Sequence, residues 1–183
     1  MPDPVLVDPL VSRRKYEREV TDLLSPVLDV RKQGWIVEPV GFPIVRVTFL
    51  TAHLPFPVAE FTVEMDFTNY DFLPLSVKFL HPTTLRPLKT IAGFQMTEQG
   101  PRHLIIAAHP DTRLPFLCLP GVREYHTHPE HNGDAWDLHR YSKNGRLYVI
   151  LERLWRFCVR PVSYIVVPEF PKKEKIPFVK AKP

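Results

Sequence analysis

The sequence predicts an α+β fold, and three observations support that class. A helical period of apolar residues comes first, an alternating period typical of strands follows, and a second helical period comes late in the chain. Helices and strands do not alternate in the βαβ manner, which separates this chain from the α/β class. The length of 183 residues suits one domain. We expect a domain over residues 1–170 and a basic tail rich in proline and lysine at 171–183.

The first predicted helix begins near Asp8-Pro9, where an N-cap residue precedes a proline in the first turn. Apolar residues then recur with the helical period and form one stripe: Tyr16, Val20, Leu23, Leu24, Val27 and Leu28. The charged residues between them are expected to form an outer face rich in arginine: Arg13, Arg14, Lys15, Glu17, Arg18 and Glu19. Pro26 is expected to end this helix near Ser25.

Four strands are expected next, because the apolar period changes from 3.6 to 2. They are predicted in the segments WIVEPVG, FPIVRVTFL, EFTVEMDF and LSVKF. In the third segment apolar and polar residues alternate, which indicates a sheet with one buried face and one wet face. Short connections containing Gly, Pro, Asn or Asp make a four-stranded antiparallel meander the simplest topology.

A long irregular region rich in proline, histidine and turn residues follows at residues 81–142. Such a region inside a domain is usually functional or disordered. An amphipathic helix is predicted after it in NGRLYVILERLWRFCV, with one apolar stripe: Leu147, Ile150, Leu151, Leu154, Trp155 and Cys158. We expect Cys158 to be a core residue because it lies on that stripe. The segment VSYIVVPEF is expected to add a short strand or extended segment.

Composition argues against several classes of protein. The net charge is a modest +4, and no aromatic-rich basic stripe of the kind that binds single-stranded nucleic acid stands out. No apolar run approaches the ~20 residues that span a bilayer, and the chain does not begin like a secretory signal. Two cysteines do not make a disulfide framework. We therefore expect a reduced cytoplasmic protein, without nucleic-acid or membrane partners, whose free thiol can act as a nucleophile.

The segment HPDTRLPFLCLPGVREYHTHPEH, residues 109–131, holds one of the two cysteines and four of the eight histidines. Its cysteine, Cys118, lies in an irregular stretch where Pro120 and Gly121 oppose regular structure, and loops often carry nucleophiles. A thiolate is both a good nucleophile and a good leaving group, so Cys118 is a candidate for covalent acyl chemistry. The alternative is a buried loop cysteine without a chemical role.

A metal site is a second interpretation of the same region. Imidazoles and carboxylates that suit zinc are gathered there: His126, His128, His131, His139, Asp134 and Asp137. His126-Thr127-His128-Pro129 resembles the His-x-His-Pro motif of the zinc-dependent JAB/MPN deubiquitinases. Asp137 and His139 stand where that family has a serine and an aspartate. A zinc-binding loop or metallohydrolase using His126, His128 and His139 therefore stays open.

The order of elements resembles that of the ubiquitin-conjugating enzymes, the UBC or E2-like superfamily, and especially its divergent bacterial branch. The passage FTVEMDFTNYDFLPLSVKFL resembles the family's third-to-fourth strand passage, although the family's double proline is not intact. His109-Pro110-Asp111 precedes Cys118-Leu119 by nearly the distance that separates the family's His-Pro-Asn from its catalytic cysteine. The predicted helix from about Arg146 to Val159 matches the helix behind the family's active site, and Trp136 matches a tryptophan beyond the cysteine.

This resemblance implies a UBC-like fold and an acyltransferase that needs no cofactor. Cys118 would receive the C-terminus of a ubiquitin-like protein from an E1-like activating enzyme as a thioester, then pass it to an amine of a protein substrate. Bacterial relatives often belong to antiphage-defence operons. The resemblance also implies that the first helix docks the activating enzyme, with basic side chains that attract an acidic surface: Arg13, Arg14, Lys15 and Arg18.

Polar residues around the cysteine are assigned roles on the same basis. Asp111 replaces the family's asparagine, and because an ionised carboxylate cannot donate a hydrogen bond to an oxyanion, we expect it to cap the loop instead. His126 and His128 are candidates for the missing donors, and Asp134 and Asp137 for promoting deprotonation of the acceptor lysine. A non-catalytic UBC-like binding module remains an alternative, against which the presence of the cysteine argues.

Overall fold

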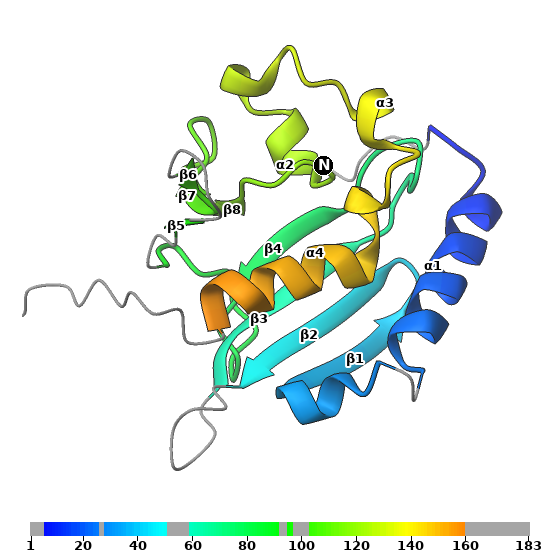
Figure 1. The fold of residues 1–183 in the computed structure, drawn as a ribbon, viewed down its shortest axis with the longest axis vertical. Helices are drawn as coiled ribbons and strands as arrows, with labels where there is room; N and C mark the ends of the chain where they lie inside the picture. The colour runs from blue at the N-terminus through cyan, green and yellow to red at the C-terminus, as the bar shows by residue number, and fades with distance from the viewer. Residues whose placement is uncertain (1–5, 26–27, 51–58, 92–94, 97–102, 160–183) are drawn as a thin grey trace, which may run out of the picture.

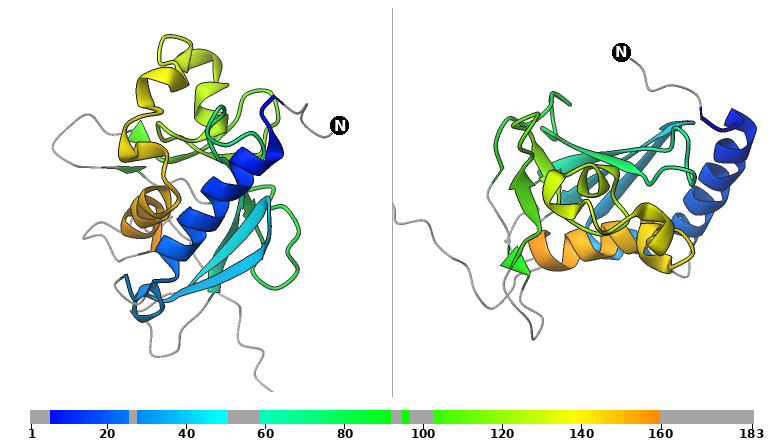
Figure 2. Two further views of the ribbon diagram at one scale, coloured as in Figure 1. Left: turned by 90° about the vertical axis from the view of Figure 1, so that its right-hand side faces the viewer. Right: turned by 90° about the horizontal axis from the view of Figure 1, so that it is seen from above.

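The computed structural model describes residues 6–25, 28–50, 59–91, 95–96 and 103–159. Within them the chain is α+β, with an N-terminal helix, a four-stranded antiparallel sheet and C-terminal helices, as predicted. Figure 1 shows helix α4 (Leu147–Leu154) crossing one face of the sheet. Seen from above in Figure 2, helix α1 (Pro9–Leu23) and the green strands that precede α4 lie at opposite sides of the sheet. The expected segment VSYIVVPEF and the basic tail lie outside the described residues.

Helix α1 begins where the sequence predicts, because the Asp8 carboxylate accepts a hydrogen bond from the Leu10 backbone N–H at 2.8 Å. Its buried face holds Ser12, Tyr16, Glu19, Val20 and Leu23. Two expectations about this helix are wrong. Leu24, at the C-cap, is 45% exposed instead of buried, and Glu19 is only 4% exposed instead of lying on the charged outer face.

The sheet is the predicted meander, with neighbouring strands paired in the order β1-β2-β3-β4: β1 (Trp35–Gly41), β2 (Ile44–Leu50), β3 (Ala59–Asp66) and β4 (Ser76–Leu80). Its register also follows the predicted alternation. Val47 and the other inward residues of β2 are fully buried. On the opposite face, Arg46 pairs with Glu64 at 3.0 Å and Thr48 bonds to Thr62 at 2.7 Å across β2 and β3.

Helix α4 covers the inner face of the sheet and continues as a π-helix over Trp155–Val159. Its apolar stripe is buried as predicted, with Leu147, Leu151 and Leu154 all 0% exposed, except that Trp155 is only partly buried against the core. Cys158 is 8% exposed and belongs to the same core, which confirms its prediction as a core residue. The inner face of the sheet, α1 and α4 therefore share one hydrophobic core.

Glu19 is buried because it serves the N-terminal end of α4. Its carboxylate accepts hydrogen bonds from the Leu147 backbone N–H at 3.2 Å and from Arg146 Nε at 3.1 Å. The residue at the N-cap, Arg146, makes no side-chain capping bond of its own. An acceptor from a distant helix therefore satisfies a donor at this helix end.

The region over 81–142, expected to be irregular, contains several short elements. They are β5 (Gln95–Met96), β6 (His103–Leu104), β7 (Ile106–Ala108), β8 (Pro115–Leu117), α2 (Arg123–His126), the 3₁₀ turn η2 (Pro129–His131) and α3 (Trp136–His139). Strands β7 and β8 form an antiparallel hairpin. Among the described residues, no helix combines the length and apolar character that crossing a membrane requires.

Two carboxylates attach this region to the rest of the fold. Glu124 of α2 accepts hydrogen bonds from the Ser76 hydroxyl and, at 3.0 Å, from the Val77 backbone N–H of β4. Asp71, between β3 and β4, forms ion pairs with Lys15 of α1 and with Arg140, the latter at 3.1 Å. Helix α2 is therefore anchored to β4, and the chain just after α3 is anchored to the connection between β3 and β4, which also binds α1.

Candidate cysteine site

Cys118 follows β8 directly and is held there by its backbone. Its N–H donates to the Ile105 carbonyl at 2.7 Å, and its neighbours Leu117 and Leu119 are 0% and 1% exposed. The cysteine itself is only partly buried. Because both neighbours are anchored in the core, the backbone at Cys118 is held in place.

An imidazole faces the thiol. His131, at the end of η2, places Nε2 at 3.4 Å from Cys118 Sγ. Its ring stacks on Tyr125, with centroids 4.0 Å apart and planes at 17°. The Tyr125 hydroxyl in turn donates to Asp134 Oδ2 at 2.7 Å. The cysteine therefore belongs to a network that also fixes the orientation of its imidazole neighbour.

The environment favours the uncharged form of both members of this pair. Burial raises the pKa of the Cys118 thiol, and the Glu130 carboxylate raises it further. Burial lowers the pKa of His131, and the neighbouring His128 lowers it further. A neutral thiol and a neutral imidazole at this distance suit an S–H group donating to Nε2, rather than a preformed thiolate–imidazolium pair.

His126 has no N–H left for a reacting oxygen. Its Nε2 accepts a hydrogen bond from the Gly121 backbone N–H at 3.1 Å. Nδ1 therefore carries the hydrogen, and it donates to the Asp134 carbonyl at 2.7 Å. Burial lowers the pKa of His126, which favours this neutral form. The geometry makes His126 a link between two loop segments and argues against the donor role expected from the sequence.

His109 and His128 pack together beside the hairpin. His109 is 6% exposed, and its Nδ1 accepts from the Asp111 backbone N–H at 3.3 Å. The His128 ring stacks on Phe116 at 5.3 Å and meets the edge of His109 at 5.5 Å. Its Nδ1 accepts from the Glu130 backbone N–H at 3.2 Å, which places the hydrogen of the neutral ring on Nε2. His128 thus retains one donor near the site, whereas His109 organises the loop.

The three candidate carboxylates differ in position. The Asp111 side chain is 73% exposed and, within the described part of the chain, accepts no hydrogen bond from the loop backbone, contrary to expectation. Asp137 is exposed on α3. Asp134 alone joins the network, since it accepts from Tyr125 and pairs with His139, and these contacts lower its pKa.

The imidazoles of this region do not converge on a common point. The described residues contain no group of three or more His, Cys, Asp or Glu side chains placed to hold a metal ion. His139 pairs with Asp134, while His128 lies among His109, Phe116 and His131. The geometry therefore gives no support to zinc held by the three histidines that the sequence suggested.

The basic residues expected to attract a partner lie along α1: Arg13, Arg14, Lys15 and Arg18. Lys15 is committed within the molecule because it pairs with Asp71. The three arginines are exposed, and the Arg18 side chain is 58% exposed. The basic surface available to a partner is therefore formed by arginine alone.

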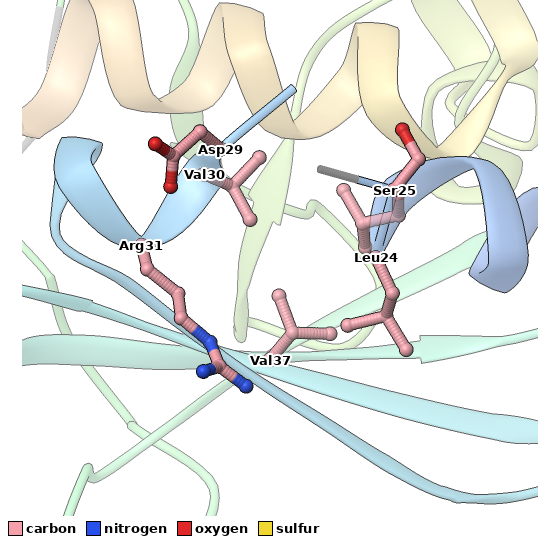
Figure 3. A pocket seen from close by; sticks show the side chains of 7 residues that line it. Leu24, Ser25, Asp29, Val30, Arg31 and Val37 are labelled. Atoms are coloured by element: carbon pink, nitrogen blue, oxygen red, sulfur yellow. The ribbon is translucent and has the colours of Figure 1, made fainter. Parts of the chain in front are cut away.

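A cavity of about 390 Å³ lies between the C-terminal end of α1, the 3₁₀ turn η1 (Val30–Gln33) and β1. Figure 3 shows its lining: Leu24, Ser25, Asp29, Val30, Arg31 and Val37, with Leu23 as the seventh residue. None of these residues belongs to the cysteine site. Its lining mixes apolar side chains with the charged Asp29 and Arg31 of the segment around η1.

The fold and the site together define an α+β protein with a cysteine–histidine pair beside a four-stranded meander. Residues 7–101 and 91–162 match the model of the Y4jH-like family, and the chain belongs to that family. It is 33% identical over 187 residues to the uncharacterized protein y4jH of Sinorhizobium fredii, covering 91% of each chain.

Two residues of the network, Tyr125 and Glu130, belong to no motif that the sequence shows. A third, His131, appears in the sequence only as one of the possible zinc ligands. The closeness of His131 to Cys118 depends on how the segment from Val122 to Asp134 folds back, and that segment has no period. The cluster of histidines just after the cysteine was the available signal.

Proposed function

We propose that this protein is an E2-like conjugating enzyme that carries the C-terminus of a ubiquitin-like protein as a thioester on Cys118. The observation that carries the proposal is the placement of the thiol. Cys118 is partly exposed immediately after β8, on a hairpin whose loop holds His109-Pro110-Asp111. The helix–meander–cysteine–helix order, with α4 across the inner face of the sheet, also favours a UBC-like fold.

In the loading step, Cys118 Sγ attacks the carbonyl carbon of a thioester held by an E1-like activating enzyme. The new C–S bond forms, the bond to the activating enzyme's sulfur breaks, and that sulfur receives the thiol proton. In the second step a substrate amine attacks the same carbon, the bond to Sγ breaks, and Cys118 regains a proton. Neither step uses a metal or an organic cofactor.

The exposed arginines of α1 form the docking surface for the activating enzyme in this proposal. Arg14 and Arg18 are exposed to an acidic partner, although Arg18 also lies 4.0 Å from the Glu19 carboxylate, whereas Lys15 pairs closely with Asp71. Such charges act mainly on the rate of encounter. We assign the reaction to a bacterial ubiquitin-like conjugation system of the antiphage-defence type. The bacterial source of the y4jH relative is consistent with that assignment.

The test is reconstitution with an activating enzyme and a ubiquitin-like protein encoded by neighbouring genes. The full chain is incubated with both proteins and ATP, and the products are separated with and without a thiol reductant. The proposal predicts an adduct of one ubiquitin-like protein that the reductant removes, and its loss in Cys118→Ala. Cys158→Ala is the matched control, because that thiol is buried in the core. An adduct that survives Cys118→Ala would refute the proposal.

A further inference from the structure

We infer that His131 is a catalytic residue that accepts the proton of Cys118 as Sγ attacks an acyl carbon. This inference rests on the acyl transfer proposed above and assigns its proton acceptor. His131 Nε2 lies 3.4 Å from Sγ, within the range of a hydrogen bond to sulfur. A nucleophile with a base at this distance, whose ring is held by a third group, is the recurring arrangement of covalent catalysis.

The other imidazoles of the site are committed to different contacts: His109, His126, His128 and His139. His126 uses both ring nitrogens within the loop, as described above. His128 accepts at Nδ1 and stacks on Phe116. Within the described part of the chain, His131 is the imidazole that contacts Sγ. The assignment therefore follows from geometry and not merely from the abundance of histidine.

The His131 ring is held in place from several directions. Tyr125 covers one face at 4.0 Å, and the Asp134 carboxylate fixes Tyr125 through its hydroxyl. The His131 backbone N–H donates to the His128 carbonyl at 3.0 Å, and its carbonyl accepts from the Asp134 N–H at 2.9 Å. A base held in this way loses little conformational freedom when the thiol reacts.

The proton balance closes without any further reagent. In loading, the S–H proton moves to His131 Nε2 as the C–S bond forms, and then to the departing sulfur of the activating enzyme. In transfer, Nε2 takes a proton from the attacking amine and delivers it to Cys118 Sγ as the C–S bond breaks. The cation that forms transiently on His131 lies near the carboxylates of Glu130 and Asp134, which favour it.

A small thioester, phenyl thioacetate, tests this inference without any partner protein. Acetylation of Cys118 in the full chain is followed by mass spectrometry, with peptide mapping to separate it from Cys158. A positioned base contributes roughly 10²–10⁴-fold, so His131→Gln is expected to slow acetylation by about 10²-fold. His81→Gln is the matched control. His81 is exposed, and its ring accepts hydrogen bonds from the Thr83 and Thr84 backbone N–H groups. Acetylation of Cys118 in His81→Gln should proceed at the wild-type rate.

The pH profile separates a catalytic role from a structural one. The titratable groups that face His131 are Cys118, Tyr125, His128, Glu130 and Asp134. Because burial lowers the pKa of His131, the ring loses its proton below the ordinary imidazole pKa of about 6.5, so the wild-type rate should already be level at neutral pH. In His131→Gln the rate should instead follow thiol ionisation and keep rising with pH. Added imidazole should partly restore the rate of His131→Ala.

Two outcomes overturn the inference. One is a His131→Gln acetylation rate within about twofold of wild type, a loss smaller than a positioned base would cause. The other is a pH profile in His131→Gln that matches the wild-type profile. If His131→Gln does not fold, the failure of imidazole to accelerate His131→Ala has the same meaning. The test also stands apart from the proposed function. If acetylation depends on His131 but the reconstitution gives no ubiquitin-like adduct, His131 is supported as the base and the conjugating activity is refuted. If the ubiquitin-like adduct forms equally well in His131→Gln, the conjugating activity is supported and the role of His131 as the base is refuted.

Discussion

Glu19 and Leu147, 128 positions apart in the chain, are joined by a buried hydrogen bond of 3.2 Å from the Leu147 backbone N–H to the Glu19 carboxylate. The bond ties the C-terminal half of α1 to the N-terminal end of α4, two helices that Figure 1 shows. The Arg146 guanidinium pairs with the same carboxylate at 3.1 Å. Since α4 is the helix that covers the inner face of the sheet, α1 helps to fix how the core is closed.

Replacing Glu19 should therefore destabilise the whole fold. Glu19→Ala removes two acceptors and leaves the Leu147 N–H unpaired in the core, which typically costs about 1–3 kcal/mol. Glu17→Ala, on the exposed side of the same helix, is the matched control and should stay within about 0.5 kcal/mol of wild type. Urea unfolding measures both, and equal stabilities of the two variants would contradict this role of Glu19.

The ion pairs of Asp71 should make the free energy of unfolding fall at acid pH. Burial alone raises the pKa of Asp71, but its bonds to Lys15 and Arg140 outweigh burial and hold the pKa below its ordinary value. A carboxyl whose pKa is lower in the folded state contributes stability above its unfolded pKa, and that stability is lost as pH falls through the folded pKa.

Asp71→Asn is therefore expected to reduce the free energy of unfolding by about 1–3 kcal/mol at pH 7. It should also flatten the decline in stability below about pH 4, where an ordinary aspartate begins to protonate. The measurement is urea unfolding across pH 2–7. Asp137→Asn, at an exposed carboxylate, should leave the profile unchanged. A steeper acid decline in Asp71→Asn than in wild type would contradict the prediction.

Residue 145 should have to be glycine, because the Trp136 ring packs directly against it. A Cβ at Gly145 would lie 2.3 Å from Trp136 Cη2, so the ring would have to move. Trp136 Nε1 donates to the Asp71 carbonyl at 3.0 Å, and that bond would be strained as well. Overpacking of this kind typically costs about 1–3 kcal/mol.

The matched control for Gly145→Ala is Gly133→Ala, because a Cβ at Gly133 would meet no atom within 4 Å. Only the first variant should lower the midpoint of thermal unfolding and shift the tryptophan fluorescence. Wild-type fluorescence and stability in Gly145→Ala would show that the contact does not hold Trp136 in place.

Charge reversal on α1 should slow loading of Cys118. Arg14→Glu with Arg18→Glu replaces two exposed positive charges with negative ones, and steering by such charges changes association rates by roughly 10-fold or more at low salt. The readout is the reconstituted loading rate at about 20 mM and about 300 mM salt, where the Debye length falls from roughly 20 Å to roughly 6 Å. Arg86→Glu, exposed beyond β4, is the control. A defect of equal size at both salt concentrations would argue against electrostatic steering.

Local pattern was enough to predict the meander, both long helices and the core position of Cys158, because each depends on a period of apolar residues. Glu19 could not be predicted, since a charged residue between apolar positions ordinarily faces water. Its burial is imposed by a helix end that lies far away in the sequence. Leu24 is the opposite case, an apolar residue predicted to be buried that is exposed. The helix ends at Leu23, so the apolar stripe no longer faces the core at Leu24.

The candidate site was predicted less completely than the fold. The cysteine and the histidine-rich segment stand out in the sequence, but the role of each imidazole depends on which ring nitrogen is already used. Gly121 and Asp134 occupy both nitrogens of His126, whereas His131 is turned toward the thiol by its stack on Tyr125. These contacts arise within a segment without periodicity, where spacing alone does not predict proximity.

The most direct test of the central claim is to trap the acyl group on residue 118 in cells that make this protein. Wild type, Cys118→Ser and Cys118→Ala are purified under acid conditions, and their adducts are identified by mass spectrometry. The account predicts a thiol-sensitive adduct of a ubiquitin-like C-terminus on wild type, a thiol-resistant but base-labile ester on Cys118→Ser, and neither on Cys118→Ala. The same adduct on all three proteins, or none on wild type and Cys118→Ser, would contradict it.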